Sequence, residues 1–146
     1  MKVIARMFYL LDNNLDKDIF IGYHAHNNLQ LAYSNAQSLT NIHTLRKIII
    51  DASIFGMGRG AGNLNTELFT NYLNINLGKK YVIDPLLEII DDILNNIYQE
   101  HYWGYSLAHY LSATFNCHPN YASYLDDKNV LTISAISDIL RAIPIY

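Results

Sequence analysis

Two short apolar runs separated by a helix constrain most strongly how this chain can fold. Residues 18–25 and 48–50 are rich in β-branched and aromatic side chains, which is typical of buried strands. Residues 28–40 carry small or apolar side chains at helical spacing: Leu29, Ala32, Ala36 and Leu39. A strand, a helix and a second strand form a βαβ unit, which implies parallel pairing with a right-handed crossover. The sequence therefore predicts an α/β fold.

Two histidines stand at the end of the first predicted strand, separated by one residue. Side chains alternate across a strand, so His24 and His26 are expected on the same side, about 6–7 Å apart along the chain. At that separation two imidazoles can bind one metal ion. The alternative is that both rings leave the strand and are hydrated or hydrogen-bonded. The pair alone does not decide between these interpretations.

Four glycines at alternate positions, residues 56, 58, 60 and 62, follow the second predicted strand. This spacing suits neither a strand nor a helix and predicts a loop whose backbone can approach a ligand closely. A dinucleotide site is disfavoured, although Gly56-x-Gly58-x-x-Ala61 nearly fits G-x-G-x-x-G/A, because the expected acidic residue after a further strand is absent. A plain turn and an active-site loop stay open. The latter gains support because parallel strands bring this loop and the histidines to one edge of the sheet.

The remaining segments read as helices. They are predicted at about 2–12, at 65–76 with Asn63 or Asn65 as cap, from Asp84-Pro85 onward, at 105–115, at 119–126, and after Thr132 as cap. The chain is therefore expected to be helix-rich and to consist of two parts. Residues 1–78 form the βαβ-containing part and residues 79–146 form a helical C-terminal region.

Composition excludes several classes of partner. With 51% hydrophobic and 16% charged residues, the 146-residue chain is globular, and a net charge of −3 without a basic face argues against nucleic acid and anionic membranes. The single Cys117 rules out an internal disulfide, which fits a cytoplasmic location, and is interpreted as a small buried apolar residue. No signal sequence or membrane span is predicted.

Together these motifs resemble the aldolase and acyl-lyase superfamily that includes 4-hydroxy-2-oxovalerate aldolase, hydroxymethylglutaryl-CoA lyase and isopropylmalate synthase. The resemblance covers residues 19–75. It rests on GYHAHNN at residues 22–28, IDAS at 50–53, GMGRGAGN at 56–63, and the Thr66-Glu67 pair that follows. It implies a (β/α)₈ TIM barrel of which this chain is a C-terminal fragment, with the two strands as about strands 7 and 8.

The resemblance also implies a site and a reaction. His24, His26 and Asn63 would be ligands of a divalent metal, Mn²⁺ first and Mg²⁺ or Zn²⁺ as alternatives. Arg59, with the backbone of Gly58 and Gly60, would line the substrate mouth. The implied activity is a lyase reaction, the cleavage or formation of a C–C bond next to a 2-oxo acid of the pyruvate type.

The resemblance further implies that parts of the active site lie outside this chain. A barrel of this type needs about 250 residues, and the family's metal-binding carboxylate lies on its first strand. Asp51 follows the second strand and is not expected to replace that carboxylate, and no catalytic residue is assigned. His109 or Tyr105 in the tail is a candidate for a late acid or base. His43 is interpreted as solvated, and His101 and His118, in the helical tail, are assigned no role.

Two expectations for partners follow. The chain alone is expected to be inactive and to need the missing N-terminal barrel half or self-association. The alternative function is a non-catalytic assembly module, because two parallel strands with unpaired outer edges can pair with another chain.

Overall fold

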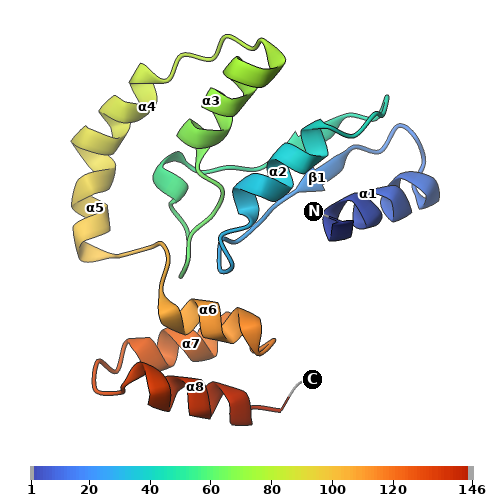
Figure 1. Cartoon of the computed structure of the whole chain (residues 1–146). Coiled ribbons are helices and arrows are strands. Elements are labelled where there is room, and N and C mark those ends of the chain that lie inside the picture. Colours follow the sequence, from blue (N-terminus) through green and yellow to red (C-terminus); the bar gives the residue numbers. More distant parts are fainter. Residues whose placement is uncertain (1, 145–146) are drawn as a thin grey trace.

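The computed structural model describes residues 2–144 and contains a parallel two-stranded sheet (Figure 1). Strand β1 (Ile21–Tyr23) pairs with β2 (Ile48–Ile50), so that Ile21 lies opposite Ile48 and Tyr23 opposite Ile50. The predicted parallel pairing is confirmed. The described part of the chain is helix-rich and has the organisation of part of an α/β fold.

The helices follow in the predicted order. Helix α1 (Lys2–Asn14) precedes β1, α2 (Ala32–Thr40) connects the strands, and a 3₁₀ turn η1 (Ile54–Gly56) leads through the glycine loop to α3 (Thr66–Leu77). The second half contains α4 (Asp84–Ile89), η2 (Ile90–Leu94), α5 (Asn95–Glu100), α6 (Leu107–Thr114), α7 (Pro119–Asp126) and α8 (Ile133–Ala142).

The first strand and the helix after it are shorter than predicted. Ile19 and Phe20 are exposed, and β1 pairs from Ile21 onward. After the strand, the chain turns where Gln30 N donates to Asn27 O at 2.9 Å, with Gln30 in the left-handed region at φ 57°. Asn27 Oδ1 then accepts from Ala32 N at 3.2 Å, and α2 begins there instead of at residue 28.

A hydrophobic core holds the sheet and the first three helices together. It contains buried side chains from α1, β1, α2, α3 and the loop before α3: Phe8, Ile21, Tyr23, Ala32, Ala36, Leu39, Leu64 and Phe69. Arg46 lies beside this core with a buried side chain that reaches back to the end of α1. The core fixes the position of the loops at the carboxyl ends of both strands, where the candidate site lies.

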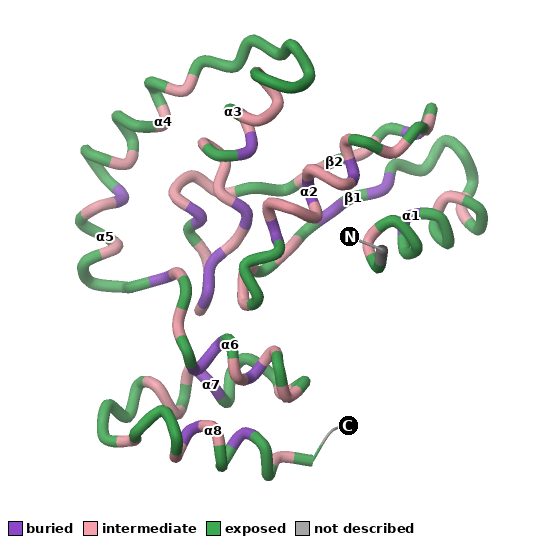
Figure 2. Tube along the Cα trace, in the orientation of Figure 1, coloured by how far each residue is buried: buried purple, intermediate pink, exposed green. Residues whose placement is uncertain are grey.

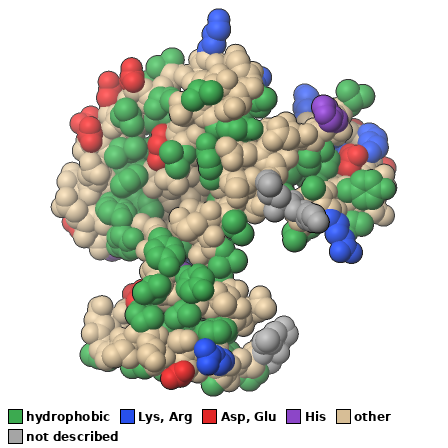
Figure 3. Space-filling model, viewed as in Figure 1, with side chains coloured by type: hydrophobic (Ala, Val, Ile, Leu, Met, Phe, Trp, Pro, Cys, Tyr) green, Lys and Arg blue, Asp and Glu red, His purple; other side chains and the backbone are tan. Residues whose placement is uncertain are grey.

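The helix predicted from Asp84 is one helical path interrupted by a π-helical turn. Pro85 lies in its first turn, as predicted, and η2 separates α4 from α5. Of the apolar side chains along this path, Leu94 is buried, while Leu87, Ile93 and Ile97 are exposed. Hydrophobic side chains are correspondingly visible along this side of the molecule in Figure 3.

The last three helices pack on one another as a separate group below the sheet (Figures 1 and 2). Their core consists of Ala108, Ala122, Ile136 and Leu140. Thr132 caps α8 as predicted, because its hydroxyl accepts from Ala135 N at 3.2 Å. Cys117 is half-buried against this core and donates to Leu140 O at 3.0 Å, so its predicted packing role is confirmed in part. No helix within residues 2–144 has the length and apolarity that crossing a membrane would require.

Candidate functional site

His24 and His26 lie just beyond the end of β1, where the structure brings their rings together. The ring centroids are 5.2 Å apart with the rings nearly perpendicular. His26 pairs through its backbone with Asn63, in an isolated antiparallel bridge, and Asn27 N donates to Gly62 O at 2.9 Å. The two histidines and the end of the glycine loop are therefore neighbours, as the parallel pairing predicted.

Asp51 stands closer to this pair than the sequence suggested. Its backbone N donates to Tyr23 O at 2.9 Å, which places it level with the end of β1. Its Oδ2 atom lies 3.3 Å from His24 Nδ1, with both side chains more than half exposed. The cause is the strand register. Tyr23 lies opposite Ile50, so the residues that follow them, His24 and Asp51, lie next to each other on the two neighbouring chain segments. Asp51 therefore orients one candidate ligand.

Asn63 is held in the glycine loop with one atom left without a partner. Its Nδ2 atom donates to Met57 O at 3.0 Å, while its Oδ1 atom is buried and has no hydrogen-bond partner within the described residues. A Cβ at Gly58 would lie 2.7 Å from Asn63 Nδ2, so a residue without a side chain is needed beside this amide. A buried amide oxygen without a partner is costly and is suited to a ligand or a water molecule.

The side-chain donor atoms present are of kinds that bind divalent cations, but there are too few of them to complete the coordination of one. Two imidazoles and an amide oxygen are ligands that Mn²⁺, Mg²⁺ or Zn²⁺ accepts in proteins. Across residues 2–144, however, no three His, Cys, Asp or Glu side chains converge closely enough to hold a metal ion. If His24, His26 and Asn63 bind a metal ion, they would therefore supply only part of its coordination shell, and a further ligand would have to come from elsewhere.

Arg59 and Gly60 meet the helical tail. Arg59 Nη2 donates to Asn120 Oδ1 at 2.9 Å across 61 residues of sequence. Gly60, with φ 58°, lies against the His109 ring so closely that a side chain at this position would collide with it. Of the two tail residues proposed as a late acid or base, His109 reaches the loop. Tyr105 is half exposed and lines a different cavity, which it shares with Asn63.

His109 is buried between two hydroxyl groups. Its Nδ1 atom is 2.8 Å from Ser106 Oγ and its Nε2 atom is 3.2 Å from Ser123 Oγ. Burial lowers the pKa of His109 below its ordinary value, although Asp126 and Asp127 act in the opposite direction. A neutral imidazole that bridges two hydroxyls is the favoured form at this position.

Sequence reasoning missed three residues of the tail that face the histidine edge of the sheet. His118, Asn120 and Ser123 line a cavity together with His26 and Arg59. The available signal was His118 followed by Pro119, which marks a helix start and so directs the residues after it. The sequence assigned His118 no role, whereas the structure places it at the border of this cavity.

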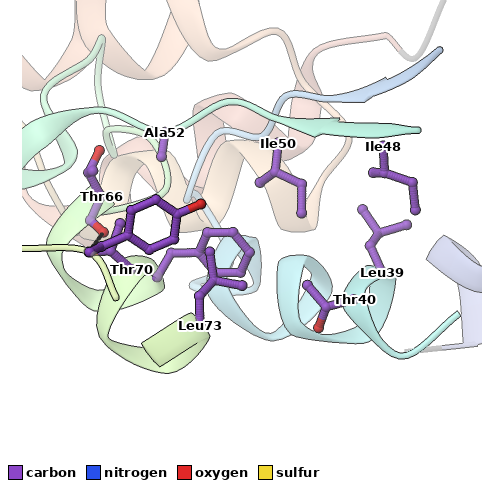
Figure 4. A pocket seen from close by; sticks show the side chains of 10 residues that line it. Leu39, Thr40, Ile48, Ile50, Ala52, Thr66, Thr70 and Leu73 are labelled. Atoms are coloured by element: carbon purple, nitrogen blue, oxygen red, sulfur yellow. Dashed lines mark hydrogen bonds between the residues drawn. The ribbon is translucent and has the colours of Figure 1, made fainter. Parts of the chain in front are cut away.

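A larger, mostly apolar cavity lies elsewhere, against the helix-covered face of β2 (Figure 4). Its volume is about 480 Å³, and Figure 4 shows Ile48 and Ile50 of β2 and Leu39 of α2 among its side chains. Neither His24 nor His26 lines it. Among the described residues, its lining offers hydroxyl groups and no carboxylate, imidazole, amine or thiol.

Comparison with known proteins identifies relatives for part of the chain. It is 31% identical to the 4-hydroxy-2-oxovalerate aldolase of Pseudoalteromonas translucida over 93 residues, which are 62% of this chain and 26% of that enzyme. It is 36% identical to the enzyme of the same name from Geobacillus genomosp. 3 over 80 residues, 47% of this chain and 23% of that enzyme. The chain thus spans about a quarter of the length of these relatives. No family model matches it.

A solved structure extends the similarity to almost the whole chain. The N-terminal domain of a Bacteroides vulgatus protein described as an aldolase matches with a TM-score of 0.78 and 29% sequence identity. The match covers 97% of this chain and 44% of that one. In sequence and in fold, the chain is therefore related to part of the 4-hydroxy-2-oxovalerate aldolases, and the resemblance predicted from its motifs is confirmed.

Proposed function

We propose that this chain forms part of the active-site mouth of a divalent-metal-dependent aldolase that acts on a 2-oxo acid. One observation carries the proposal: the His24 and His26 rings lie 5.2 Å apart at the carboxyl ends of two parallel strands, and His26 pairs through its backbone with Asn63, whose amide oxygen has no partner within the described residues. Ligands of α/β folds bind at that edge. In this interpretation β1 and β2 are strands 7 and 8 of a TIM barrel, residues 79–146 are its helical C-terminal region, and the enzyme is cytoplasmic.

His24, His26 and Asn63 would hold the cation, with Mn²⁺ favoured and Mg²⁺ or Zn²⁺ as alternatives. When bound, the cation supplies Lewis-acid stabilisation of the negative charge that develops on the 2-oxo acid as its C–C bond breaks. The Asp51 carboxylate, 3.3 Å from His24 Nδ1, would fix the orientation of that ring and so direct its other nitrogen.

The glycine loop would hold the substrate. Arg59 offers a guanidinium group whose remaining N–H donors can bind a carboxylate. The backbone of Gly58 and Gly60 would also line this mouth, with the Asn63 and His109 side chains packed where side chains at these two positions would otherwise lie. Among the described residues, Asp51 is paired with His24, and the His109 ring is hydrogen-bonded to two hydroxyl groups. The proton transfers are therefore assigned to residues that another segment supplies.

Mn²⁺ affinity tests the ligand assignment. The double variant His24→Ala/His26→Ala is expected to bind Mn²⁺ at least about tenfold more weakly than the parent chain, because two of the three candidate donors are lost. Isothermal titration calorimetry or the Mn²⁺ electron paramagnetic resonance signal measures this affinity.

His43→Ala is the matched control, since His43 is an exposed histidine in the connector before β2. It should bind Mn²⁺ as the parent does. Equal affinity in the double variant and the parent would exclude His24 and His26 as ligands. In the same preparations, cleavage of a 4-hydroxy-2-oxo acid by this chain alone would contradict the inference that its active site is incomplete.

A second candidate function, a non-catalytic assembly module, is favoured by the sheet itself. Within residues 2–144, β1 and β2 pair with each other and with no further strand. Ile49, in the middle of β2, is half exposed on the face opposite the cavity of Figure 4. An edge strand with an exposed apolar residue favours pairing with another strand, either from the missing barrel half or from a second copy.

Solution mass tests the assembly proposal. The purified chain is expected to have a mass above its monomer value of 16.7 kDa in light scattering coupled to size-exclusion chromatography. Ile49→Lys should return it to the monomer, because a lysine in an edge strand blocks pairing. Lys substitution of the equally exposed Leu10 on α1 is the control and should leave the mass unchanged. A monomeric parent chain would contradict self-association.

A further inference from the structure

A small polar cavity lies between the glycine loop and the tail helices α6 and α7. Its volume is about 180 Å³, and the polar side chains that define it come from four separate segments: His26, Arg59, His109, His118, Asn120 and Ser123. Sites for drug-sized ligands have volumes of about 300–1,000 Å³, so this cavity suits a single small group. His26, a candidate metal ligand, forms part of its wall.

Direct bonds between the loop and the tail build this cavity. Gly104 N donates to Gly60 O at 2.9 Å, and Trp103 Nε1 donates to Phe55 O at 2.9 Å. The Arg59–Asn120 hydrogen bond closes one side. The absence of a side chain at Gly60 lets the His109 ring approach the loop. The walls are therefore set by specific contacts and not by a loose gap between two parts.

The lining is rich in hydrogen-bond donors and contains no carboxylate among the described residues. Arg59 uses one of its guanidinium N–H groups on Asn120, which leaves others available. His118 Nδ1 accepts from Asn120 N at 3.2 Å, so its other ring nitrogen carries the proton and can donate. The carboxylates Asp126 and Asp127 border an adjoining cavity, which shares Arg59, His109 and Ser123 with this one.

We propose that this cavity binds an anionic group, a carboxylate or a phosphate, at the end of the aldolase substrate remote from its 2-oxo acid group. The assignment rests on the proposed function, because it places the reacting end of the substrate at the His24–His26 pair. Arg59 would pair with the anion, while His118 would donate a further hydrogen bond; the Ser123 hydroxyl already donates to Pro119 O. The preferred substrates would then be dianionic aldols, and an aldol ending in a methyl group would leave these donors unpaired.

Anion binding to the metal-free chain tests this inference. Succinate and inorganic phosphate are titrated separately into the ¹⁵N-labelled protein, in buffer freed of divalent metal, and amide shifts of Arg59 and Asn120 are followed. At least one anion is expected to bind with a dissociation constant below about 10 mM. Arg59→Gln and His118→Gln are each expected to weaken that binding, by about tenfold for Arg59→Gln because hydrogen bonds to charged groups are the strong ones.

Control variants and ligands distinguish anion binding in this cavity from non-specific attraction to positive charge and from metal binding at the histidine pair. Arg141→Gln removes an arginine of α8 that does not line the cavity and should leave the affinity unchanged. Binding of succinate alone identifies a carboxylate as the occupant, and binding of phosphate alone identifies a phosphate. Neutral succinamide bound as well as succinate, equal losses in Arg59→Gln and Arg141→Gln, or no binding of either anion would overturn the proposal. Failure of the metal assignment would instead show in the Mn²⁺ titration, which this experiment does not involve.

Discussion

Arg46→Ala is expected to lower the free energy of unfolding by about 3 kcal/mol, a large effect for one residue. The Arg46 side chain is only 1% exposed, and its Nε atom donates to Asp12 Oδ1 at 2.6 Å. Its terminal nitrogens donate to four backbone carbonyl groups at the end of α1 and in the turn that leads to β1: those of Asp12, Leu15, Asp16 and Ile19. Alanine would remove all of these hydrogen bonds. Asp12 O and Asp16 O would keep Lys17 Nζ and Ile19 N as donors, whereas the Leu15 and Ile19 carbonyl groups would lose the donor that Arg46 provides. Chemical denaturation measures the cost in unfolding free energy.

Two further measurements make this prediction specific. Arg141 lies over the Phe115 ring, with its Cζ atom 5.2 Å from the ring centroid. Arg141→Ala should lower the free energy of unfolding by no more than about 1 kcal/mol. The Arg46 hydrogen bond, followed by that of Lys17, lowers the pKa of Asp12 below its ordinary value of 3.8. The stability from this pair is therefore present above pH 3.8 and is lost as the pH falls through the lower, folded-state pKa. In Arg46→Ala the free energy of unfolding should therefore fall less steeply as the pH is lowered. A chemical denaturation midpoint equal to that of the parent chain would contradict the predicted loss of stability.

Gly62→Ala is expected to have the second large effect on stability and to lower the free energy of unfolding by at least about 2 kcal/mol. Gly62 has φ 75°, a left-handed conformation that costs a residue with a side chain about 1–2 kcal/mol. A Cβ there would also lie 2.5 Å from the carbonyl oxygen of Gly56, a backbone atom that cannot move aside without moving the loop. Thermal unfolding measures the loss. Because Asn63 is the next residue, Mn²⁺ affinity should fall as well.

Gly22→Ala is the matched control for this substitution. Gly22 lies in β1, and a Cβ built on it has no atom within 4 Å. Since alanine is favoured over glycine within a strand, the variant should be as stable as the parent or slightly more so. If Gly62→Ala unfolded at the same temperature as Gly22→Ala, the glycine loop would have accommodated the Cβ with no loss in the free energy of unfolding. The close packing of this loop would then not be needed for stability.

Local sequence patterns were sufficient for most of the secondary structure. The β-branched run at residues 48–50 forms β2 at the predicted residues. Thr132 caps its helix with its hydroxyl, and Pro85 lies in the first turn of α4. Each of these features depends on a few adjacent residues, because backbone propensity, capping and the fixed φ of proline act locally. Local signals failed at the start of α2, where the hydrogen bonds of Asn27 decided the boundary, and at the start of β1, where pairing with β2 begins only at Ile21.

Part of the candidate site could also be derived from the sequence. His24 and His26 lie together because one residue separates them at the end of a strand. They meet the glycine loop because parallel strands bring their carboxyl ends to one edge. The assignment of His24, His26 and Asn63 as metal ligands, and of Arg59, Gly58 and Gly60 as substrate-binding residues, stays a prediction that the Mn²⁺ and anion titrations test.

The sequence alone thus determined the βαβ unit, the helical tail and the meeting of the histidines with the glycine loop, because periodicity, turn chemistry and parallel pairing are readable from neighbouring residues. The tertiary structure decided which distant groups contact one another. Asp51 faces His24 through the strand register, Arg59 reaches Asn120 over 61 residues, and His109 packs on Gly60. Such contacts depend on how whole elements pack, and no local pattern encodes that arrangement.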